Sequence, residues 1–289
     1  MTLEQLRIFV AVAEREHVTR AAQALNLTQS AVSGAVAAME DQHQVKLFDR
    51  VGRGVVLNDA GRMFLDEARG VLARAGAATQ MLAEIGGLAR GTLRIVASQT
   101  IAGYWLPPLL AEFRRRHPGI RVVAAIANTR DAARQVHDGA AELGFVEGPV
   151  DDRALARWTV AEDRLMLVAR DAPERVDATW LKRARWVVRE EGSGTRAIFE
   201  QAIHAAGVDP ATLDIALELP SNEAVRTAVG HGAGVTMLSA LVVAESLAAG
   251  TLRALPFDAV ARPFYGLRHK ERYRTRAADA LYDLARECA

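Results

Sequence analysis

The sequence predicts a multi-domain protein with an N-terminal all-α winged helix-turn-helix, a long linker helix and a two-lobed α/β domain. Three observations predict this architecture. Short helices joined by a tight turn fill the first 58 residues, a heptad pattern of apolar residues follows, and from Thr92 onward strands alternate with helices. We therefore expect domains at 1–58, 59–88 and 89–289.

The N-terminal segment carries helix-start and helix-stop signals in the order of a helix-turn-helix. Thr2 and Gln5 form a capping box in front of an apolar stripe. The stripe residues are Leu3, Leu6, Phe9, Val10 and Ala13. A second helix, at about 18–25, ends at Asn26, which tolerates the left-handed backbone of a tight turn, and Thr28 caps the third helix. After it, the Gly-x-Gly of "KLFDRVGRGVVL" predicts the turn of a two-stranded wing.

The third predicted helix, within "LTQSAVSGAVAAMED", has a face without long side chains. Val32, Val36 and Met39 form its buried stripe, whereas the opposite face is small and uncharged, where a solvated helix would carry Glu and Lys. The second helix of a helix-turn-helix lies in the major groove, and small residues allow close approach to base edges. A protein–protein contact through the same residues is the alternative. The predicted DNA contacts are Thr28, Gln29, Ser30, Ser33 and Gly34 on this helix, with Arg50 and Arg53 on the wing.

The segment after the wing predicts one long helix, capped by Asn58 and ended by Gly86 and Gly87. Its apolar residues are spaced alternately four and three apart, which is a heptad seam. The seam residues are Phe64, Ala68, Val71, Ala75, Ala78, Leu82 and Ile85. A seam needs a partner helix, so the pattern indicates a dimer coiled coil. Packing of the seam on its own domain is the alternative.

The rest of the chain carries eight predicted strands separated by helices, which is the α/β pattern. The strands are "LRIVAS", "RVVAAIA", "LGFVEG", "RLMLVAR", "RWVVRE", "IALEL", "GVTMLS" and "FYGLRH". The order of strand, polar turn, helix and strand occurs first from "RIVAS" and again from "WVVRE". Two similar lobes with a cleft between them explain the repeat. We expect lobe I at 89–162 and 266–289, and lobe II at 163–265.

Four predicted strands are followed at once by small hydroxyl or amide residues that begin a helix. They lie at Ser98–Gln99–Thr100, Asn128–Thr129, Gly192–Ser193–Gly194–Thr195–Arg196 and Ser221–Asn222. Ligands of open α/β sheets bind beyond the carboxyl ends of strands, and helix N-termini favour an anion. Gly192 and Gly194 would let the backbone approach a ligand, and Arg196 would add a bidentate fork. The alternative is that all four are ordinary helix caps.

Composition and motifs argue against several other classes. Lys and Arg number 36 against 35 Asp and Glu, so overall charge indicates no polyanion partner. Cys288 is the single cysteine, and neither a signal peptide nor an 18-residue apolar window occurs, so we expect a cytoplasmic protein without a membrane span. The sequence shows no metal-ligand spacing, nucleophile elbow or Walker loop, so we expect no enzyme, catalytic residue, metal or cofactor. Solvated surface explains Glu190–Glu191 and the basic run 268–276 more simply than acid/base or DNA-binding roles do.

The stretch "LRIFVAVAEREHVTRAAQALNLTQSAVSGAVAAMEDQHQVKLFDRVGRGVVLNDAG" resembles LysR-type transcriptional regulators. Its most specific pieces are "TRAAQALNLTQSAVS" and "LFDR-GRG-L-AG", and the order of parts extends the resemblance over the whole chain. Two positions depart from the family pattern. Gly34 stands where many members carry a basic or long residue, and Asn58 stands where many carry Thr.

The resemblance implies a homodimer or homotetramer on a pseudo-palindromic promoter site of double-stranded DNA, with RNA polymerase as a further partner. It also implies a small effector between two lobes of the type 2 periplasmic-binding-protein-like fold. By motif position, the effector contacts fall on Ser98, Thr100, Asn128, Thr129, Ser193, Thr195 and Asn222. The effector domain is similar to a subgroup tied to sulfur, nitrogen and CO2 assimilation, in agreement with an anionic effector. A solute-binding protein or an enzyme with two α/β lobes and no sequence-specific DNA binding is the alternative.

Overall fold

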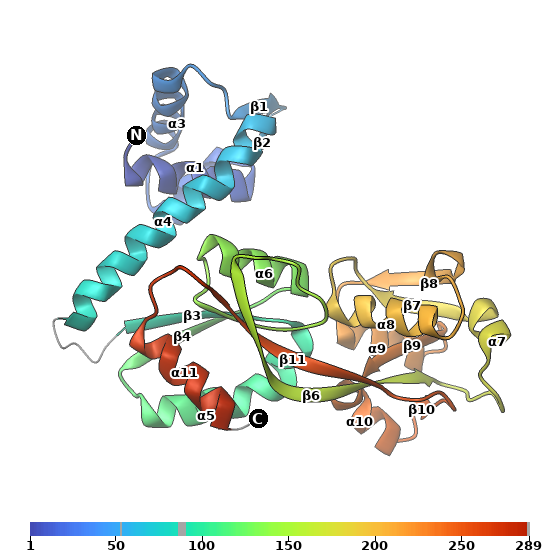
Figure 1. The fold of residues 1–289 in the computed structure, drawn as a ribbon. Helices are drawn as coiled ribbons and strands as arrows, with labels where there is room; N and C mark the ends of the chain where they lie inside the picture. The colour runs from blue at the N-terminus through green and yellow to red at the C-terminus, as the bar shows by residue number, and fades with distance from the viewer. Residues whose placement is uncertain (53, 86–90, 288–289) are drawn as a thin grey trace. The chain divides into compact units, whose positions relative to one another are not determined.

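The computed structural model describes residues 1–52, 54–85 and 91–287 (Figure 1). The chain folds into two compact units. The first comprises residues 1–87 and 138–140, and the second comprises residues 88–137 and 141–289. Within the described residues, no helix is long and apolar enough to cross a bilayer.

The first unit has three short helices, a two-stranded wing and a long helix. In chain order these are α1 (Leu3–Arg15), α2 (Val18–Leu25), α3 (Gln29–His43), β1 (Phe48–Val51), β2 (Gly54–Leu57) and α4 (Asp59–Ile85). The wing strands pair antiparallel across a turn that contains Gly52, whose φ of 59° suits glycine. Phe9 of α1 is fully buried, with the rings of Phe48 and Phe64 centred 5.4 Å and 5.0 Å away. The wing and the long helix therefore close one core.

The helix boundaries of this unit follow from their caps, as the sequence predicts. The capping box between Thr2 and Gln5 is present at the start of α1. The helix α2 ends at Asn26, whose φ is 54°. Thr28 Oγ1 accepts a hydrogen bond from the Ala31 N–H at 3.2 Å and so caps α3. The predicted helix-turn-helix is confirmed.

The buried stripe of α1 is broader than the sequence predicts. Leu3, expected inside, is 45% exposed, whereas Ile8, Ala11 and Val12 are buried. The reason is that α1 contributes to two apolar clusters. One cluster includes residues of the wing and α4, and the other includes residues of α2 and α3. A helix packed on two sides buries more than one stripe.

The heptad seam of α4 divides into two parts. Asn58 caps the helix, as predicted, by accepting the Gly61 N–H at 2.8 Å. Near this end, Ala68 is buried in the core of its own unit. Further along, Val71 and Leu82 are 42% and 71% exposed within this chain, and the side chain of Ile85 lies outside what the structure describes. The start of the seam thus packs on its own unit. Pairing of the exposed seam residues in a dimer coiled coil remains a prediction.

The second unit is built on one mixed sheet (Figure 1). Its elements are β3 (Gly91–Ala97), the π-helical turn η1 (Ile101–Trp105), α5 (Leu106–Arg116), β4 (Ile120–Ile126), α6 (Thr129–Asp138), β5 (Leu143–Glu147), β6 (Leu155–Ala169), α7 (Ala178–Arg183), β7 (Arg185–Arg189), α8 (Gly194–Ala205), the 3-10 turn η2 (Pro210–Thr212), β8 (Asp214–Leu219), α9 (Asn222–Gly230), β9 (Val235–Ser239), α10 (Ala240–Ala248), β10 (Arg253–Ala254), β11 (Val260–His269) and α11 (Arg276–Glu287). The strand order is β4-β3-β5-β11-β6-β9-β7-β8, and β10 pairs with β6.

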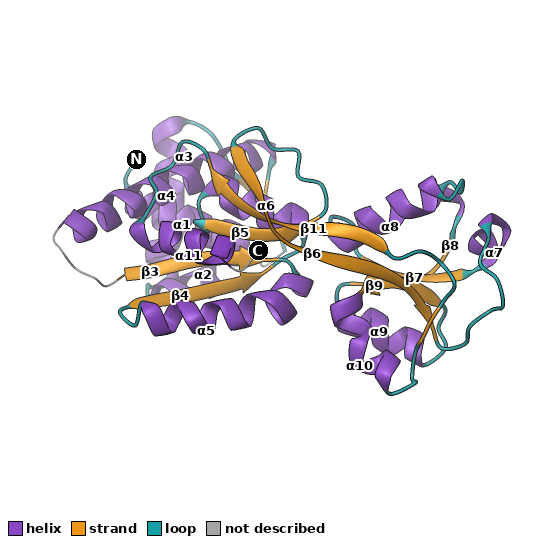
Figure 2. Cartoon of the chain, turned by 60° about the horizontal axis from the view of Figure 1, so that its bottom comes forward, coloured by secondary structure: helices purple, strands orange, loops and turns teal. Residues whose placement is uncertain are grey.

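The two lobes of this unit share the long strands β6 and β11, which pass between them as an antiparallel pair (Figure 2). The register of this pair shifts between Phe264 and Tyr265. Each lobe has its own apolar cores, which contain Phe145 in lobe I and Trp186 in lobe II. The predicted two-lobed α/β architecture is confirmed.

All eight predicted strands are present, but two features differ from expectation. The strand β6 begins at Leu155, well before "RLMLVAR", and the short β10 was not predicted. The expected lobe boundaries, 162/163 and 265/266, fall inside β6 and β11. Because both strands belong to both lobes, the division at these residues remains a prediction.

Candidate DNA-binding surface and effector site

The exposed face of α3 carries the predicted DNA contacts of the helix. Val32 and Met39 are buried beneath this face, as predicted, whereas Val36 of the predicted buried stripe is only half-buried. The Thr28 and Ser30 hydroxyl oxygens lie 3.1 Å apart at the start of the helix. The exposed residues among the predicted contacts are Thr28, Gln29, Ser30, Ser33 and Gly34.

The basic residues of the wing differ in what they contact. Arg50 on β1 is exposed, and Arg53 lies outside the described residues. Lys46, which the sequence also places at the wing, donates from Nζ to Glu40 Oε2 at 2.9 Å. This hydrogen bond raises the pKa of Lys46 above its ordinary value. Glu40 also accepts the Leu47 N–H at 2.8 Å, so this carboxylate fastens the wing to the end of α3.

Several helix N-termini meet where the lobes of the second unit touch. The sequence predicts those that follow β3, β4, β7 and β8, and the structure adds the start of α10 at Ser239. The predicted effector contacts that are buried here are Ser98, Thr100, Thr129, Ser193, Thr195 and Asn222. Asn128 is half-buried and caps α6 by accepting the Asp131 N–H at 2.9 Å. The structure therefore brings the seven predicted residues to one region.

Asn222 connects the two lobes through its side chain and its backbone. Its Nδ2 donates to Thr100 Oγ1 at 3.0 Å, and its Oδ1 accepts from Arg189 Nη1 at 2.6 Å. Its N–H donates to Gln99 Oε1 at 2.9 Å. Arg189 also donates from Nε and Nη2 to Glu190 at 2.7 Å and 2.9 Å. The amide of Asn222 is thus held by protein groups on both sides.

Arg262 on β11 is fully buried and contacts four residues of the site. Its Nε donates to Asp163 Oδ2 at 2.8 Å. Nη1 donates to Thr195 Oγ1 at 3.0 Å and lies 3.4 Å from Glu147 Oε1, and Nη2 donates to Thr100 Oγ1 at 3.2 Å. One guanidinium therefore contacts two carboxylates and two of the predicted effector residues.

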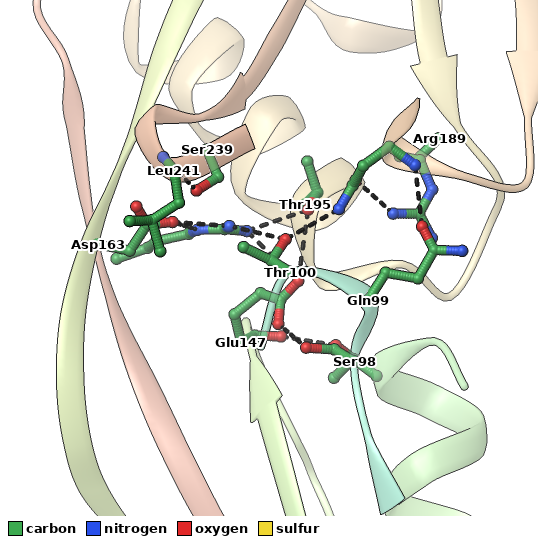
Figure 3. A network of polar contacts seen from close by, with 12 residues as sticks. Ser98, Gln99, Thr100, Glu147, Asp163, Arg189, Thr195, Ser239 and Leu241 are labelled. Atoms are coloured by element: carbon green, nitrogen blue, oxygen red, sulfur yellow. Dashed lines mark hydrogen bonds and ion pairs between the residues drawn. The ribbon is translucent and has the colours of Figure 1, made fainter. Parts of the chain in front are cut away.

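Glu147, at the end of β5, is a buried carboxylate that accepts hydrogen bonds from hydroxyl groups of the site (Figure 3). Ser98 donates from Oγ to Oε2, and Thr195 donates from Oγ1 to Oε1 at 3.4 Å. The Glu147 carbonyl accepts from Thr129 Oγ1 at 2.7 Å. Ser98 and Thr195, predicted to bind an anion, already bind one that belongs to the protein.

Sequence reasoning missed the charged groups of this site. They are Glu147, Asp163, Arg189 and Arg262. A signal was present, because Arg262 and Asp163 stand in segments otherwise rich in apolar residues, and Glu147 ends a predicted strand. What the sequence does not show is that Arg262 and Asp163 are directly opposite each other in the register of β11 and β6.

The start of α8 packs backbone to backbone against lobe I. A Cβ on Gly194 would collide with the Glu147 carbonyl, so only glycine fits there. Arg130 donates from Nη2 to Glu191 at 2.9 Å, and this bond lowers the pKa of Glu191. Glu191 is therefore paired across the lobes with Arg130, and Glu190 is paired within lobe II with its neighbour Arg189. Neither forms the acid/base pair considered from the sequence.

Arg196, predicted as a bidentate fork for an anion, is bound to protein groups in the structure. Its Nε donates to Glu200 at 2.8 Å, and its Nη1 donates to the Arg189 carbonyl at 3.0 Å and to Glu218 at 2.5 Å. The physical reason is that carboxylates on α8 and β8 lie within reach of this guanidinium and already satisfy it.

Comparison with known families identifies the chain. Residues 3–62 match the bacterial regulatory helix-turn-helix proteins of the lysR family, and residues 86–289 match the LysR substrate binding domain. The chain belongs to the LysR family. This LysR-family protein is 34% identical to the HTH-type transcriptional regulator YeiE of Escherichia coli K12, over 98% of this chain and 96% of YeiE. It is 32% identical to a probable RuBisCO transcriptional regulator of Cyanidioschyzon merolae, over 96% of this chain and 95% of the relative. It is thus a DNA-binding transcriptional regulator, as the sequence predicts.

Solved structures share the fold of this LysR-family chain. Full-length CbnR in complex with its target DNA has a TM-score of 0.68 and 22% identity, with both chains covered completely. The regulatory domain of CcmR from Synechocystis PCC6803, in complex with 2-PG, has a TM-score of 0.61 and 26% identity. That match covers 68% of this chain and 97% of the CcmR domain.

Proposed function

We propose that this LysR-family regulator contacts promoter DNA through the exposed face of α3 and the wing, and that a small anion bound between its lobes controls it. The observation that carries the second part is the buried Glu147 carboxylate, which accepts from Ser98 and Thr195. A relative with bound DNA and another with bound 2-PG support the two roles. Double-stranded DNA is the nucleic acid partner in this proposal.

The donors around Glu147 determine the class of the effector. Two hydroxyls and the Arg262 guanidinium point at this carboxylate, and several helix N-termini begin around it. Such donors suit the oxygens of a carboxylate, a phosphate or a sulfur oxyanion. Asp163 and Glu147 already place two negative charges beside Arg262, so an added anion would be repelled unless Glu147 left its position. We therefore expect anion binding to displace the Glu147 side chain.

Displacement of the Glu147 side chain would change hydrogen bonds in both lobes. Its carboxylate bonds to Ser98 of lobe I and Thr195 of lobe II, and its ion pair reaches Arg262 on a strand that both lobes share. A ligand that binds one arrangement of these contacts more tightly than the other shifts the population toward it. In a homodimer or homotetramer, the changed lobe contacts would alter the spacing of the DNA-binding units.

The effector role is tested by calorimetric titration of the full-length protein with 2-PG and, separately, with sulfate. Thr195→Val and Ser98→Ala should each abolish the heat of anion binding and the anion's effect on DNA binding, because each removes a donor. DNA affinity without the anion should stay within about twofold. Equal losses of anion and DNA binding in both variants would contradict this division of labour.

The DNA role is tested by retaining sheared genomic fragments on the purified protein and sequencing them at physiological and at higher salt. A few sharp sites that share an inverted repeat are expected for a symmetric dimer. Diffuse retention that disappears with salt would show only non-specific charge attraction and would contradict the proposed base readout by α3.

The protein's place and chemistry follow from the same proposal. We propose that it acts in the cytoplasm, where promoter DNA and metabolite anions meet, and that it performs no catalytic step. Membership of a family of transcriptional regulators supports this view. Among the described residues, no group of three His, Cys, Asp or Glu side chains is placed to hold a metal ion. Turnover of a bound anion by the purified protein would contradict the non-enzymatic role.

A further inference from the structure

Gly34 is a glycine that its own chain does not require. It is the sixth residue of α3, has regular helical geometry and is exposed. A Cβ built on Gly34 would meet no atom of the protein within 4 Å. Gly61 of α4 is the contrast, because a Cβ there would collide with the Leu47 carbonyl. Packing explains the glycine at 61 and not the one at 34.

A glycine inside an exposed helix weakens it, because glycine loses more backbone freedom on folding than alanine does. Alanine would therefore suit position 34 better if only the fold mattered. The same helix uses alanine at the exposed positions 31, 37 and 38. The space beside Gly34 is thus free in this chain, and the observation to explain is why no methyl group fills it.

The position of Gly34 on the helix supplies the reason. At 3.6 residues per turn, Ser30, Gly34 and Ala37 form a line on the side of α3 opposite the buried Val32 and Met39. No charged residue occurs between Gln29 and Met39. Ser30 and Gly34 lie in the N-terminal half of the second helix of the helix-turn-helix, the part that approaches base edges in the major groove.

We propose that Gly34 is the point of closest approach between α3 and the major groove, and that it is a specificity-determining residue of this regulator. With only a hydrogen at Cα, the helix backbone comes nearer to the base edges than any side chain would allow. That distance sets how far Gln29, Ser30 and Ser33 reach. The inference rests on the proposed contact of α3 with DNA and adds the residue that sets its depth.

The test uses the full-length protein and a duplex selected by the wild type from random sequences. Gly34→Ala should raise the calorimetric unfolding temperature of the transition that contains residues 1–87 by about 4–8 °C, because it removes a helix-weakening glycine. In the same variant, affinity for the selected duplex, measured by fluorescence anisotropy, should fall at least tenfold. Gly34→Leu should lower it further, and affinity for random duplex should change by less than twofold in both.

Two further variants separate the possible outcomes. Gly230→Ala in α9 is the matched control, because a Cβ there also meets nothing within 4 Å, and it should leave DNA binding unchanged. Gln29→Ala tests whether α3 reads DNA at all. If Gln29→Ala weakens specific binding and Gly34→Ala does not, the inference about Gly34 is overturned while the proposed function stands. If neither variant weakens it, α3 is not the reading surface. A fall in unfolding temperature for Gly34→Ala would also overturn the inference, because the chain itself would then need the glycine.

Discussion

The replacement Glu147→Gln tests whether the Glu147 carboxylate occupies the place of the proposed anionic effector. The amide keeps the size of the side chain, but its single oxygen can replace only one of the two carboxylate oxygens that accept from Ser98 and Thr195. It removes the negative charge beside Arg262. An entering anion then has no carboxylate to displace and meets one negative charge beside Arg262, that of Asp163, instead of two, so we expect tighter anion binding than in the wild type.

The magnitude follows from the contacts that the carboxylate makes. Two unit charges about 4 Å apart interact by about 4 kcal/mol at an effective dielectric constant of about 20. A hydrogen bond to a charged group contributes about 1.5–3 kcal/mol. Relaxation and water entry reduce both contributions. We therefore expect the free energy of anion binding to become more favourable by about 1.4–4 kcal/mol, which is roughly 10-fold to 1000-fold in affinity. The ligand-free protein should lose about 1–3 kcal/mol of stability, because Arg262 loses one of its two carboxylates.

The assay is calorimetric titration of the full-length variant with 2-PG and with sulfate, followed by thermal unfolding with and without the tighter ligand. The unfolding temperature should be below that of the wild type without anion and recover when the anion is added. Glu112→Gln is the control for the change in net charge, because Glu112 pairs with Arg115 and Arg116 away from the site. Weaker anion binding by Glu147→Gln would refute the reasoning, since it would show that the carboxylate contacts the ligand.

Three further changes test other parts of the structure. Arg262→Leu should cost about 3–5 kcal/mol of unfolding free energy, since it leaves two buried carboxylates without a cation. Replacement of an exposed arginine, Arg253→Leu, should cost little. Unfolding followed by tryptophan fluorescence measures both, and equal losses would contradict a role for burial. Asn58→Ala should lower the unfolding free energy of the DNA-binding unit by about 0.5–2 kcal/mol in calorimetry, whereas Asn58→Thr should retain most of the cap. Equal losses in the two variants would contradict a capping role. Arg50→Ala should weaken binding to every DNA sequence and reduce the salt slope by about one, and a loss confined to one sequence would instead indicate base readout.

The features that the sequence predicts well are local. Thr2, Asn26, Thr28 and Asn58 act as expected because a cap involves a residue and the backbone within three positions of it. The burial of the predicted effector residues in one region has the same cause, since each stands where a strand meets a helix. Their position in one region follows from the parallel pairing within each lobe, which the α/β pattern implies.

The features that sequence reasoning missed depend on contacts between distant segments. Arg262 meets Asp163, 99 residues away, only because two long strands pair in one register. Arg196 bonds to Glu218 on β8, 22 residues away in the sequence. Leu3 is exposed although it fits the helical stripe, because nothing in its unit covers that end of α1. For the two arginines, the residue's own neighbourhood in the sequence does not reveal its partner.

The paired strands β6 and β11 determine how the lobes can move. Separate flexible connections would allow free rotation, but these strands are hydrogen-bonded to each other from Leu155 opposite His269 to Leu165 opposite Val260. Such a ribbon resists sliding and stretching, so its soft deformation is torsion, which we expect to concentrate at the irregularity between Phe264 and Tyr265. Arg262 lies on this ribbon two residues from that irregularity. Arg262, which would contact an incoming anion, is therefore attached to the part of the ribbon that twists. A change in the twist of β6 and β11 would then be the signal that the anion is bound.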